Sequence, residues 1–432
     1  MEGARLTHAP AVEMGLRNYT AERPLLLWTD FPPDHGGGGA VILRSLISED
    51  DRSKVLWVSP ALTGVRATDR MLPLVESSLV RTGRRSVFLD STFLAPALAR
   101  ETLHLAEVHG ARALWLVLHG AGVPVAAELI KRGRLPVHVT VHDDPAFAVA
   151  MRSRRYLALT PWIERQFGAS IRGATSVDVI GEGMQERYLR RYGVRSTIVH
   201  RAIVEPVSPA SRYDQAVAGL RVGLLGNLYS YSQLPVLGRA LARAARTLGV
   251  RACMTFVGNG FGERLKKDLA GLEVDVENTG HVDEARAVAI LRACYALYLN
   301  YPFAARDAVL RETSFPTKLG TYALAARPIV AHAPVGTTLA PLESLTGYVH
   351  PWKTMSETDG EDLFVRMWRN EDLRASSHEP AERLRLKYFD PRRNGSALAT
   401  ILDSLVPSFD GRPLWQPRDD RAAHNAIGAR HD

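Results

Sequence analysis

Short apolar segments alternate with longer helical patterns along most of this chain, and that alternation limits the folds it can adopt. Each apolar segment is about four to six residues long, which suits a strand, and the patterns between them, about ten to fifteen residues long, suit helices. This order predicts parallel sheets with helices on both faces, because parallel strands need long crossover connections. The expected strands are 25–28, 55–58, 87–89, 113–118, 137–141, 177–180, 197–199, 222–225, 254–257, 274–277, 296–299, 329–331 and 347–349.

The length of the chain predicts two domains. Its 432 residues exceed what one hydrophobic core usually supports, so two doubly wound, Rossmann-like α/β domains are expected. Residues 204–213, VEPVSPASRY, contain two prolines and no periodicity, which indicates a linker between a first domain, 1–203, and a second, 214–381. Ligands of such sheets bind at the carboxyl ends of the strands, so an inter-domain cleft is the expected site. Residues 408–432 are poor in apolar side chains and predict a mobile tail.

The chain is basic, with a net charge of +8 and a pI near 9.6. Two arginine clusters, within 152–155 and 186–195, are best interpreted as solvated helix faces, and peripheral contact with an anionic membrane is the alternative. No nucleic-acid-binding module accompanies them, so nucleic acid is not an expected partner.

The sequence contains no apolar run of about 18 residues and no signal-peptide core, which predicts a cytoplasmic protein, at the inner face of the cell membrane if it meets lipid. Cys253 and Cys294 are too few for a disulfide framework or a metal cluster. They are expected to be buried thiols, and no metal site is expected.

Residues 311–332, RETSFPTKLGTYALAARPIVAH, place a polar turn, a helix start and an apolar strand in one short unit. Ser314, Pro316 and Thr317 suit the opening of a helix, and Pro328 suits its end. The first amides of a helix lack partners within it, and Lys318 adds a positive charge beside them. This unit predicts a phosphate site, although an ordinary helix of an α/β sheet has the same pattern.

Four glycines, at 36–39, follow the first expected strand and precede a helix over 40–47. Glycine allows the backbone to approach a ligand closely. The spacing is not G-x-G-x-x-G, which argues against a dinucleotide-binding fingerprint. The loop is either a closing element over a substrate or a flexible connector.

Two histidines, His119 and His142, end neighbouring expected strands of the first half, and Asp143 and Asp144 follow the second. A polar residue at the end of a parallel strand points into the cleft. Asp143 is suited to accept a proton from an acceptor hydroxyl, and it equally suits the cap of the next helix.

Two glycine turns end strands of the second half, at Gly226-Asn227 and at Gly258-Asn259-Gly260. Their backbone amides would lie at the carboxyl edge of the second sheet. Together with the 311–332 unit they place three amide-rich turns along one cleft, as a nucleoside and a diphosphate would need.

The order of these segments resembles that of retaining glycosyltransferases of the group 1 type, the family-four-like enzymes. The resemblance covers residues 25–402 and is carried by LHGAG, VTVHDDP, SVDVIGEGM, GLLGN, FVGNGFGERL, NTGHV, LRACYALYLNY and SFPTKLGTYALAARPIVAH. It implies a GT-B fold, hexosyl transfer from a nucleotide-sugar substrate, and neither metal nor cofactor. It further implies that the donor binds the second domain and the acceptor the first, and that a helix over 382–407 crosses back to the first domain.

The family's motifs, matched to this sequence, imply roles for individual residues. His119 would contact the transferred sugar, and Lys318 would stabilise the leaving nucleotide. His142, Asp143 and Asp144 would lie near the acceptor, with Asp143 counted as catalytic beside His119 and Lys318. The implied donor-binding residues are Gly37, Gly38, Gly226, Asn227, Gly258, Asn259, Gly260, Glu312, Ser314, Phe315, Pro316, Thr317 and Thr321.

The chain departs from the family pattern at the implied donor site. Thr313 and Thr321 stand where many members have two glutamates, the second of which holds the ribose hydroxyls, and Glu312 lies one residue from the first. The Arg and Lys pair that usually follows the Gly226 turn is also absent.

Three functions are compatible with the sequence. The first is a glycosyltransferase acting on a sugar, lipid-linked or small-molecule acceptor in surface polysaccharide, glycolipid or natural-product biosynthesis. The second is a non-catalytic GT-B scaffold or regulatory protein. The third is a GT-B sugar-nucleotide epimerase, which would need paired carboxylates in the cleft, and the sequence shows no such set.

Overall fold

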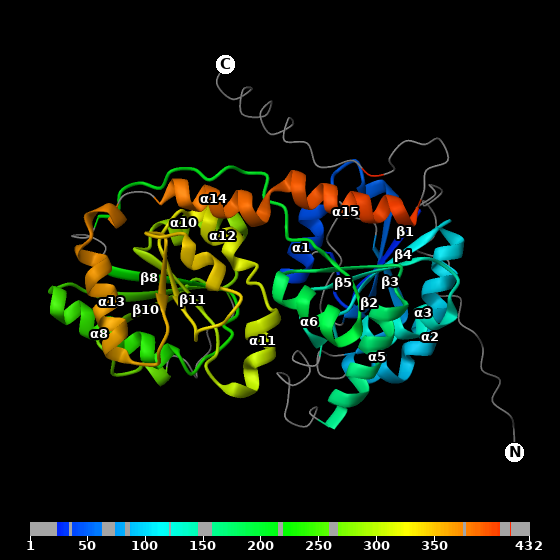
Figure 1. Ribbon diagram of the computed structural model, residues 1–432, viewed down its shortest axis with the longest axis horizontal. Coiled ribbons are helices and arrows are strands. Elements are labelled where there is room, and N and C mark those ends of the chain that lie inside the picture. The colour runs from blue at the N-terminus through cyan, green and yellow to red at the C-terminus, as the bar shows by residue number, and fades with distance from the viewer. Residues whose placement is uncertain are drawn as a thin grey trace, which may run out of the picture.

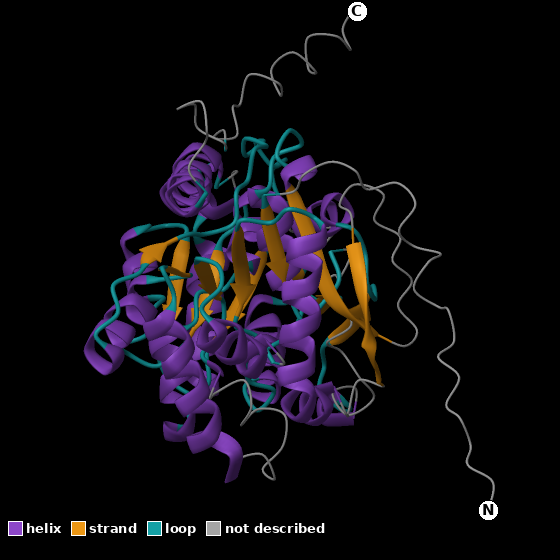
Figure 2. Ribbon diagram, turned by 90° about the vertical axis from the view of Figure 1, so that its right-hand side faces the viewer, coloured by secondary structure: helices purple, strands orange, loops and turns teal. Residues whose placement is uncertain are grey.

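The computed structural model describes residues 24–33, 37–62, 74–82, 87–120, 122–145, 158–214, 219–258, 267–374, 377–406 and 415. They form two lobes side by side (Figure 1), and helices lie on both sides of the strands (Figure 2). All strand pairs within the two sheets are parallel. The expectation of two doubly wound α/β domains is therefore confirmed.

The first sheet has seven strands in the order β3-β2-β1-β4-β5-β6-β7. Its central strands are buried along their whole length, as expected for strands covered on both faces. The strands are β1 Leu25–Trp28, β2 Val55–Leu62, β3 Leu74–Thr82, β4 Ala113–Val117, β5 Val137–Val141, β6 Ser176–Val179 and β7 Thr197–Ile198. The helices are α1 Gly38–Leu46, η1 Arg52–Lys54, α2 Val87–Val108, α3 Gly122–Arg132, α5 Thr160–Gly173 and α6 Glu182–Tyr192.

One strand expected in the first half is wrong. Residues 87–89 begin helix α2, and the edge strand beside β2 is β3, Leu74–Thr82. A run of three apolar residues fits a strand and a buried helix face equally well, so periodicity does not separate them. β3 was missed because its sequence, LVESSLVRT, mixes polar and apolar residues, as edge strands often do.

The second sheet has six strands in the order β10-β9-β8-β11-β12-β13. The strands are β8 Leu220–Leu225, β9 Ala252–Val257, β10 Asp275–Asn278, β11 Ala296–Asn300, β12 Ile329–His332 and β13 Val349–Trp352. The helices are α8 Leu234–Leu248, α10 Glu284–Arg292, η3 Ala305–Asp307, α11 Ala308–Thr313, α12 Lys318–Ala325, η4 Ala340–Ser344, α13 Glu357–Arg369, η5 Glu371–Arg374, α14 His378–Phe389 and α15 Pro391–Leu405. α8 packs against α13, and α10 against α12.

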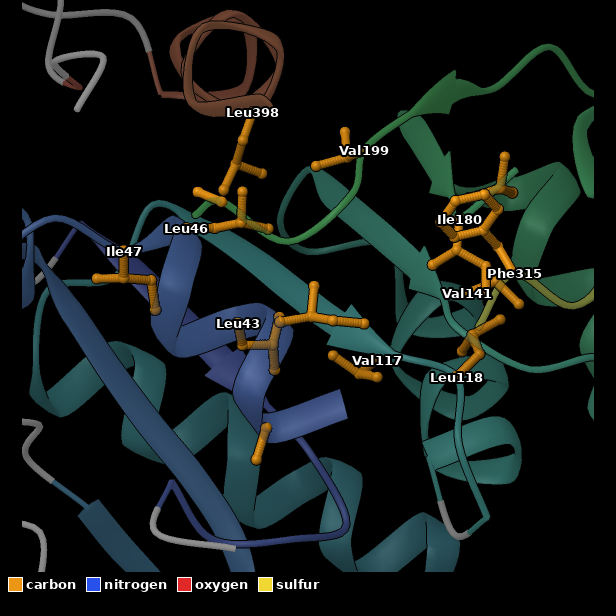
Figure 3. Packing of buried hydrophobic residues seen from close by; sticks show 14 of the residues in the cluster. Leu43, Leu46, Ile47, Val117, Leu118, Val141, Ile180, Val199, Phe315 and Leu398 are labelled. Atoms are coloured by element: carbon orange, nitrogen blue, oxygen red, sulfur yellow. The ribbon is translucent and has the colours of Figure 1, made fainter. Parts of the chain in front are cut away.

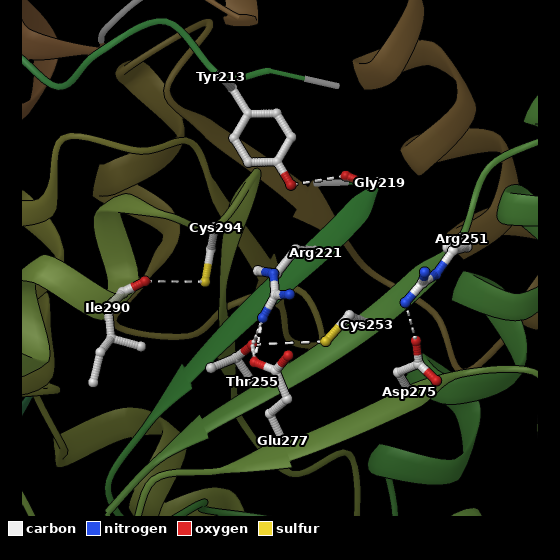
Figure 4. A network of polar contacts seen from close by, with 10 residues as sticks. All are labelled: Tyr213, Gly219, Arg221, Arg251, Cys253, Thr255, Asp275, Glu277, Ile290 and Cys294. Atoms are coloured by element: carbon white, nitrogen blue, oxygen red, sulfur yellow. Dashed lines mark hydrogen bonds and ion pairs between the residues drawn. The ribbon is translucent and has the colours of Figure 1, made fainter. Parts of the chain in front are cut away.

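The second sheet carries a polar cluster on β8, β9 and β10 (Figure 4). Arg221 donates to Thr255 Oγ1 at 3.0 Å and pairs with Glu277. The two cysteines lie in this region and are buried, as expected, and burial raises the pKa of both thiols, that of Cys294 to about 12. At neutral pH both are therefore protonated and unreactive.

The connection between the two sheets, 199–214, contains no helix or strand. Helix α14 holds it by hydrogen bonds at two residues, Ile203 and Val207. Arg385 Nη1 donates to the Ile203 carbonyl at 2.8 Å, His378 Nε2 lies 2.7 Å from the Val207 carbonyl oxygen, and the Val207 amide donates to Glu382 Oε2 at 3.1 Å. Within the predicted linker, 204–213, these contacts anchor Val207.

The segment expected to be one crossing helix, 382–407, forms two helices instead, up to the last residue that the structure describes there. Asp390 caps α15 by accepting from the Arg392 amide at 2.9 Å, and Pro391 opens that helix. α14 contacts α12 in the second domain, whereas α15 contacts α1 in the first (Figure 1). Of the predicted tail, 408–432, only Trp415 is described, and it is buried against α15.

A hydrophobic cluster extends from the first domain to the second (Figure 3). Leu43 of α1 and Val117 of β4 lie within the first domain, and Leu398 of α15 approaches from the crossing helix. Phe315, from the second domain, lies beside Ile180 of the first. Because Phe315 directly precedes Pro316, Thr317 and α12, this packing fixes the start of α12 relative to the first domain.

Candidate active site in the inter-domain cleft

His119 and Asp30 form a pair at the carboxyl edge of the first sheet. Asp30 follows β1, His119 follows β4, and these two strands are neighbours in the sheet. The Asp30 oxygens lie 2.9 and 3.1 Å from His119 Nδ1, and since a carboxylate only accepts, the proton is on Nδ1. The His119 side chain is about one-third exposed, so part of the ring is accessible from outside the protein. Asp30 was not predicted, although it ends a neighbouring strand as His119 does.

His142 lies deeper than expected. It ends β5, is 6% exposed, and neither of its ring nitrogens has a hydrogen-bond partner among the described residues. A Cβ added at Gly39 would lie 3.1 Å from Nδ1, so the glycine loop covers the imidazole. Burial lowers the pKa of His142, although Asp178 and Asp143 oppose the effect, and the ring is neutral at pH 7.

Asp143 and Asp144 have different environments. Asp144 is buried, accepts from Tyr188 Oη at 3.4 Å, and lies 3.9 Å from Arg187 Nε. Asp143 is half-buried, and none of the described residues forms an ion pair or hydrogen bond with its carboxylate. Burial, and to a lesser degree the charge of Asp143, raises the pKa of Tyr229 in the second domain, so Asp143 lies near that domain.

The segment ahead of α12 uses most of its polar groups internally. Ser314 Oγ donates to Tyr229 Oη at 3.1 Å, and the Ser314 carbonyl accepts from Tyr301 and Thr338. Phe315 and Pro316 are buried, and the Phe315 ring centroid lies 4.4 Å from that of His200. Ser314, Phe315 and Pro316 were expected to bind the donor. In the structure their contacts are with other parts of the protein and hold the segment in its conformation.

Lys318 opens α12 with its ammonium at the edge of the cleft. Nζ donates to the Asn227 carbonyl at 2.6 Å and lies 5.4 Å from the centre of the Tyr229 ring. No carboxylate of the described residues pairs with it, and burial lowers its pKa to about 8. A half-buried cation without a counter-charge favours an anionic ligand.

The helix amides contribute less than expected to this anion site. The Leu319 and Gly320 amides bond to the Pro316 and Thr317 carbonyls at 3.0 and 3.1 Å, so the expectation of unpartnered first-turn amides is wrong for these two. A tightened first turn of the 3₁₀ type explains the difference. Of the groups at the start of α12, the Lys318 ammonium is therefore the one best suited to an anion.

The glycine loop meets the start of α12 across the cleft. A Cβ at Gly38 would lie 3.0 Å from Thr317 Oγ1, and Gly37 is the N-cap of α1 without a side-chain cap bond. Gly36 lies outside the described residues. The structure therefore brings Gly38 of the first domain to Thr317 of the second.

Glu312 takes part in a second contact between the domains. Its side chain lies 3.4 Å from Arg187 of α6, the arginine that also approaches Asp144. A methyl group at Gly183, also on α6, would overlap the Glu312 carbonyl oxygen. Glu312 therefore faces the first domain, and the structure does not bring it to Lys318.

Glycines shape the carboxyl edge of the second sheet. Gly226, Gly258 and Gly280 have φ angles of 63°, 117° and 66°, where a side chain would be strained. The Gly258 amide donates to the Gly280 carbonyl at 2.8 Å, and Asn227 is exposed beside Gly226. Asn259 and Gly260, also expected to bind the donor, lie outside the described residues.

The two threonines in place of the family's glutamates have different roles. Thr313 Oγ1 donates to the Val309 carbonyl within α11 at 2.7 Å. Thr321 Oγ1 donates to Oε1 of Glu284 at 2.8 Å, and Arg201 holds the same carboxylate with contacts of 2.7 and 2.9 Å. The sequence did not predict Glu284 as a site residue, because its partners Thr321 and Arg201 lie 37 and 83 positions away along the chain.

No group of three or more His, Cys, Asp or Glu side chains suited to a metal ion occurs in the described part of the chain. None of its described helices is long and apolar enough to span a membrane.

The architecture matches solved structures across most of the chain. Anabaena HepE in complex with UDP-glucose has a TM-score of 0.62 and 16% identity, over 88% of this chain and all of that one. Sucrose-phosphate synthase from Thermosynechococcus elongatus has a TM-score of 0.63 and 11% identity, over 89% of this chain and 99% of that one. A Listeria monocytogenes protein to which UDP-N-acetylglucosamine 2-epimerase activity is ascribed has a TM-score of 0.56 and 10% identity, over 92% and 100%.

These similarities show that the chain has the GT-B fold that the sequence predicted. No protein-family profile matches the sequence, and no curated protein sequence does. Because the neighbours include transferases and an epimerase-type protein, the fold alone does not choose between these activities.

Proposed function

We propose that this protein is a glycosyltransferase that moves a sugar from a nucleotide-sugar to an acceptor hydroxyl with retention of configuration. The observation that carries this proposal is the Lys318 ammonium, half-buried at the start of α12 without a carboxylate partner among the described residues, one residue after Thr317, which Gly38 of the first domain approaches. Two solved neighbours of the same fold, HepE and the E. coli trehalose-6-phosphate protein, were crystallised with UDP-glucose and UDP-2-fluoro glucose.

In this proposal the donor diphosphate binds the Lys318 ammonium, beside the place where Gly38 meets Thr317. The nucleoside extends along the edge formed by Gly226 and Gly258. Lys318 takes the place of the absent Arg and Lys pair, because its charge balances the negative charge that develops on the leaving diphosphate.

The transferred sugar then lies at the carboxyl edge of the first sheet, where its hydroxyls contact the partly exposed ring of His119. The acceptor hydroxyl attacks the anomeric carbon as the bond to the diphosphate breaks, and its proton passes to a leaving-phosphate oxygen or to Asp143. Retention requires the acceptor to enter on the face that the diphosphate leaves. Neither a metal nor a cofactor is part of the proposal.

The epimerase alternative finds less support. Most of the carboxylates that the structure describes at this site have a basic partner. Asp30 pairs with His119, and Glu284 pairs with Arg201. Arg187 lies against both Asp144 and Glu312. Asp143 alone lacks such a partner, and one carboxylate does not form the pair that proton removal and return would use.

Incubation with a panel of nucleotide-sugars, followed by mass spectrometry, tests the proposal. We expect one donor to be hydrolysed slowly without acceptor and faster with it, and ¹H NMR to show that the released or transferred sugar keeps the anomeric configuration of the donor. If none of the nucleotide-sugars is consumed, the result would support the scaffold function. If the product is a nucleotide-sugar with inverted configuration at C2 of the sugar, it would support the epimerase.

A further inference from the structure

Glu284 is a carboxylate with a fixed orientation at the carboxyl edge of the second sheet. It is the first residue of α10, and Asp283 caps that helix. Thr321 Oγ1 and Arg201 Nη2 both donate to it, at 2.8 Å and at 2.7 and 2.9 Å. The Glu284 side chain is nevertheless 43% exposed, whereas that of Arg201 is 7% exposed. One side of the carboxylate is therefore open to a ligand, and the other side is held.

The position of Glu284 is related to that of Lys318 through helix α12. Thr321 follows Lys318 by three residues, so the two side chains share a face of the helix and lie about 5 Å apart along its axis. A phosphate on the Lys318 ammonium would thus lie about one helical turn from the Glu284 carboxylate. In a nucleotide the ribose is the group that directly follows the phosphate.

A flat backbone surface lies at the same edge. Gly258 bridges to Gly280, and a Cβ built on Gly258 would lie 3.2 Å from the Gly226 Cα atom. At Gly226 and Gly280 nothing lies within 4 Å of where a Cβ would be. Glycine at these places lets a planar ring approach the backbone, as a nucleoside base requires.

We propose that Glu284 binds the ribose hydroxyls of the donor, and that Arg201 and Thr321 position its carboxylate for this contact. This inference rests on the proposed function. A carboxylate accepts hydrogen bonds from two neighbouring hydroxyls at once, which a threonine does not. Glu284 therefore supplies from α10 the acceptor that Thr321 lacks on α12, and Thr321 keeps a role as its positioning residue.

The arrangement also links nucleoside binding to the inter-domain connection. Arg201 lies in the connection, where the neighbouring His200 amide donates to Asn394 of α15 at 3.0 Å. A Cβ at Gly320 would lie 2.6 Å from Ile203 Cδ1 and 3.3 Å from Arg201 Nε, so glycine at this position lets α12 pack closely against the connection. Arg201 Nε has no hydrogen-bond partner among the described residues. Among these residues, Glu284 is the carboxylate that pairs with the Arg201 guanidinium.

Binding of ribonucleotides and dideoxynucleotides by calorimetry tests the assignment. The probe is whichever of UDP, GDP, ADP and CDP binds the wild type best, compared with its 2′,3′-dideoxy counterpart. We expect the wild type to bind the ribo form roughly tenfold or more tightly, as for hydrogen bonds to a charged group. In Glu284→Ala this ratio should fall to about one, and in Thr321→Val it should fall partway.

Two comparisons keep the outcomes distinct. Glu361→Gln, which alters a carboxylate paired with Arg243 between α8 and α13, should keep the wild-type ratio. Because each ratio is measured within one protein, a partial loss of folding does not change it. If Glu284→Ala has the same ratio as the wild type, the assignment of Glu284 to the ribose is wrong, but the proposed function stands. If the wild type binds none of the four nucleotides, the proposed function is wrong as well.

Discussion

Lys318 is the residue on which the proposed site depends most, and its protonation should be visible in binding. Because burial lowers its pKa to about 8, the ammonium loses its proton in the range where an ordinary lysine keeps it. A bound diphosphate stabilises the charged form, so nucleotide affinity should be highest below pH 8 and fall severalfold by about pH 9.5. Titration of nucleoside diphosphate by calorimetry across this range measures the effect.

The same pKa has the opposite consequence for stability. The unfolded chain holds the Lys318 proton up to about pH 10.4, so between about pH 8 and 10 it binds more protons than the folded chain, and this residue's contribution to the free energy of unfolding rises with pH. Lys318→Met should bind nucleotide weakly at every pH and lack this rise. Lys131→Met, at an exposed position in the last turn of α3, should behave as the wild type. An affinity that does not change with pH would contradict the role of Lys318.

The two neighbouring aspartates provide a second test at the residue scale. Asp143→Asn removes a half-buried carboxylate that faces the second domain, so it should lower kcat roughly 10²-fold or more and leave the melting temperature close to that of the wild type. Asp144→Asn weakens buried contacts with Tyr188 and Arg187 and should cost about 1–3 kcal/mol of stability. Thermal unfolding and steady-state kinetics of both variants measure this, and the reverse pattern would exchange the two roles.

At the scale of elements, the contact between α6 and α11 defines how closely the domains approach. A methyl group at Gly183 would overlap the Glu312 carbonyl oxygen, whereas at Gly181 it would meet only the Phe315 side chain at 3.6 Å. Gly183→Ala should therefore push α6 away from α11 and lower kcat/KM by roughly 10²-fold, since small misplacements are costly in catalysis. Gly181→Ala is the matched control and should stay within about twofold of the wild type. Equal activity of the two variants would show that this contact does not matter for transfer.

Sequence periodicity predicted most elements because their burial is regular. Strands such as β1 and β4, apolar along their whole length, and helix α12, bounded by Pro316 and Pro328, carry local signals. The sequences of the edge strand β3 and of the start of α2 do not distinguish a strand from a helix. The break between α14 and α15 was readable in Asp390-Pro391, a cap followed by a first-turn proline, but the family resemblance favoured one helix.

The candidate site was less predictable, because much of it depends on contacts between distant segments. His119, His142 and Lys318 were identifiable from their places at strand ends and at a helix start. Asp30 became visible only through its pairing with His119, 89 positions away, and Glu284 through Thr321 and Arg201. Such pairings depend on the order of strands in the sheet and on the packing of the two domains, and neither is encoded in local pattern.

For the whole molecule, the structure shows two domains in contact on both sides of the cleft. Gly38 faces Thr317 at the centre, Arg187 pairs with Glu312 on one side, and Arg201 pairs with Glu284 beside the inter-domain connection. The first of these ion pairs is partly exposed and easily screened by salt, whereas the arginine of the second is buried. Opening of the cleft should therefore break the Arg187 pair first and use the connection near Arg201 as its pivot.

We propose above that a nucleotide-sugar binds at the start of α12, beside the glycine loop, with its diphosphate on Lys318. A crystal structure of the protein with the nucleoside diphosphate that it binds best tests this directly. We expect the diphosphate within hydrogen-bonding distance of Lys318 Nζ and near Gly38, and the ribose beside Glu284. A nucleotide bound outside the cleft, or one in the cleft whose phosphates lie away from Lys318, would contradict it.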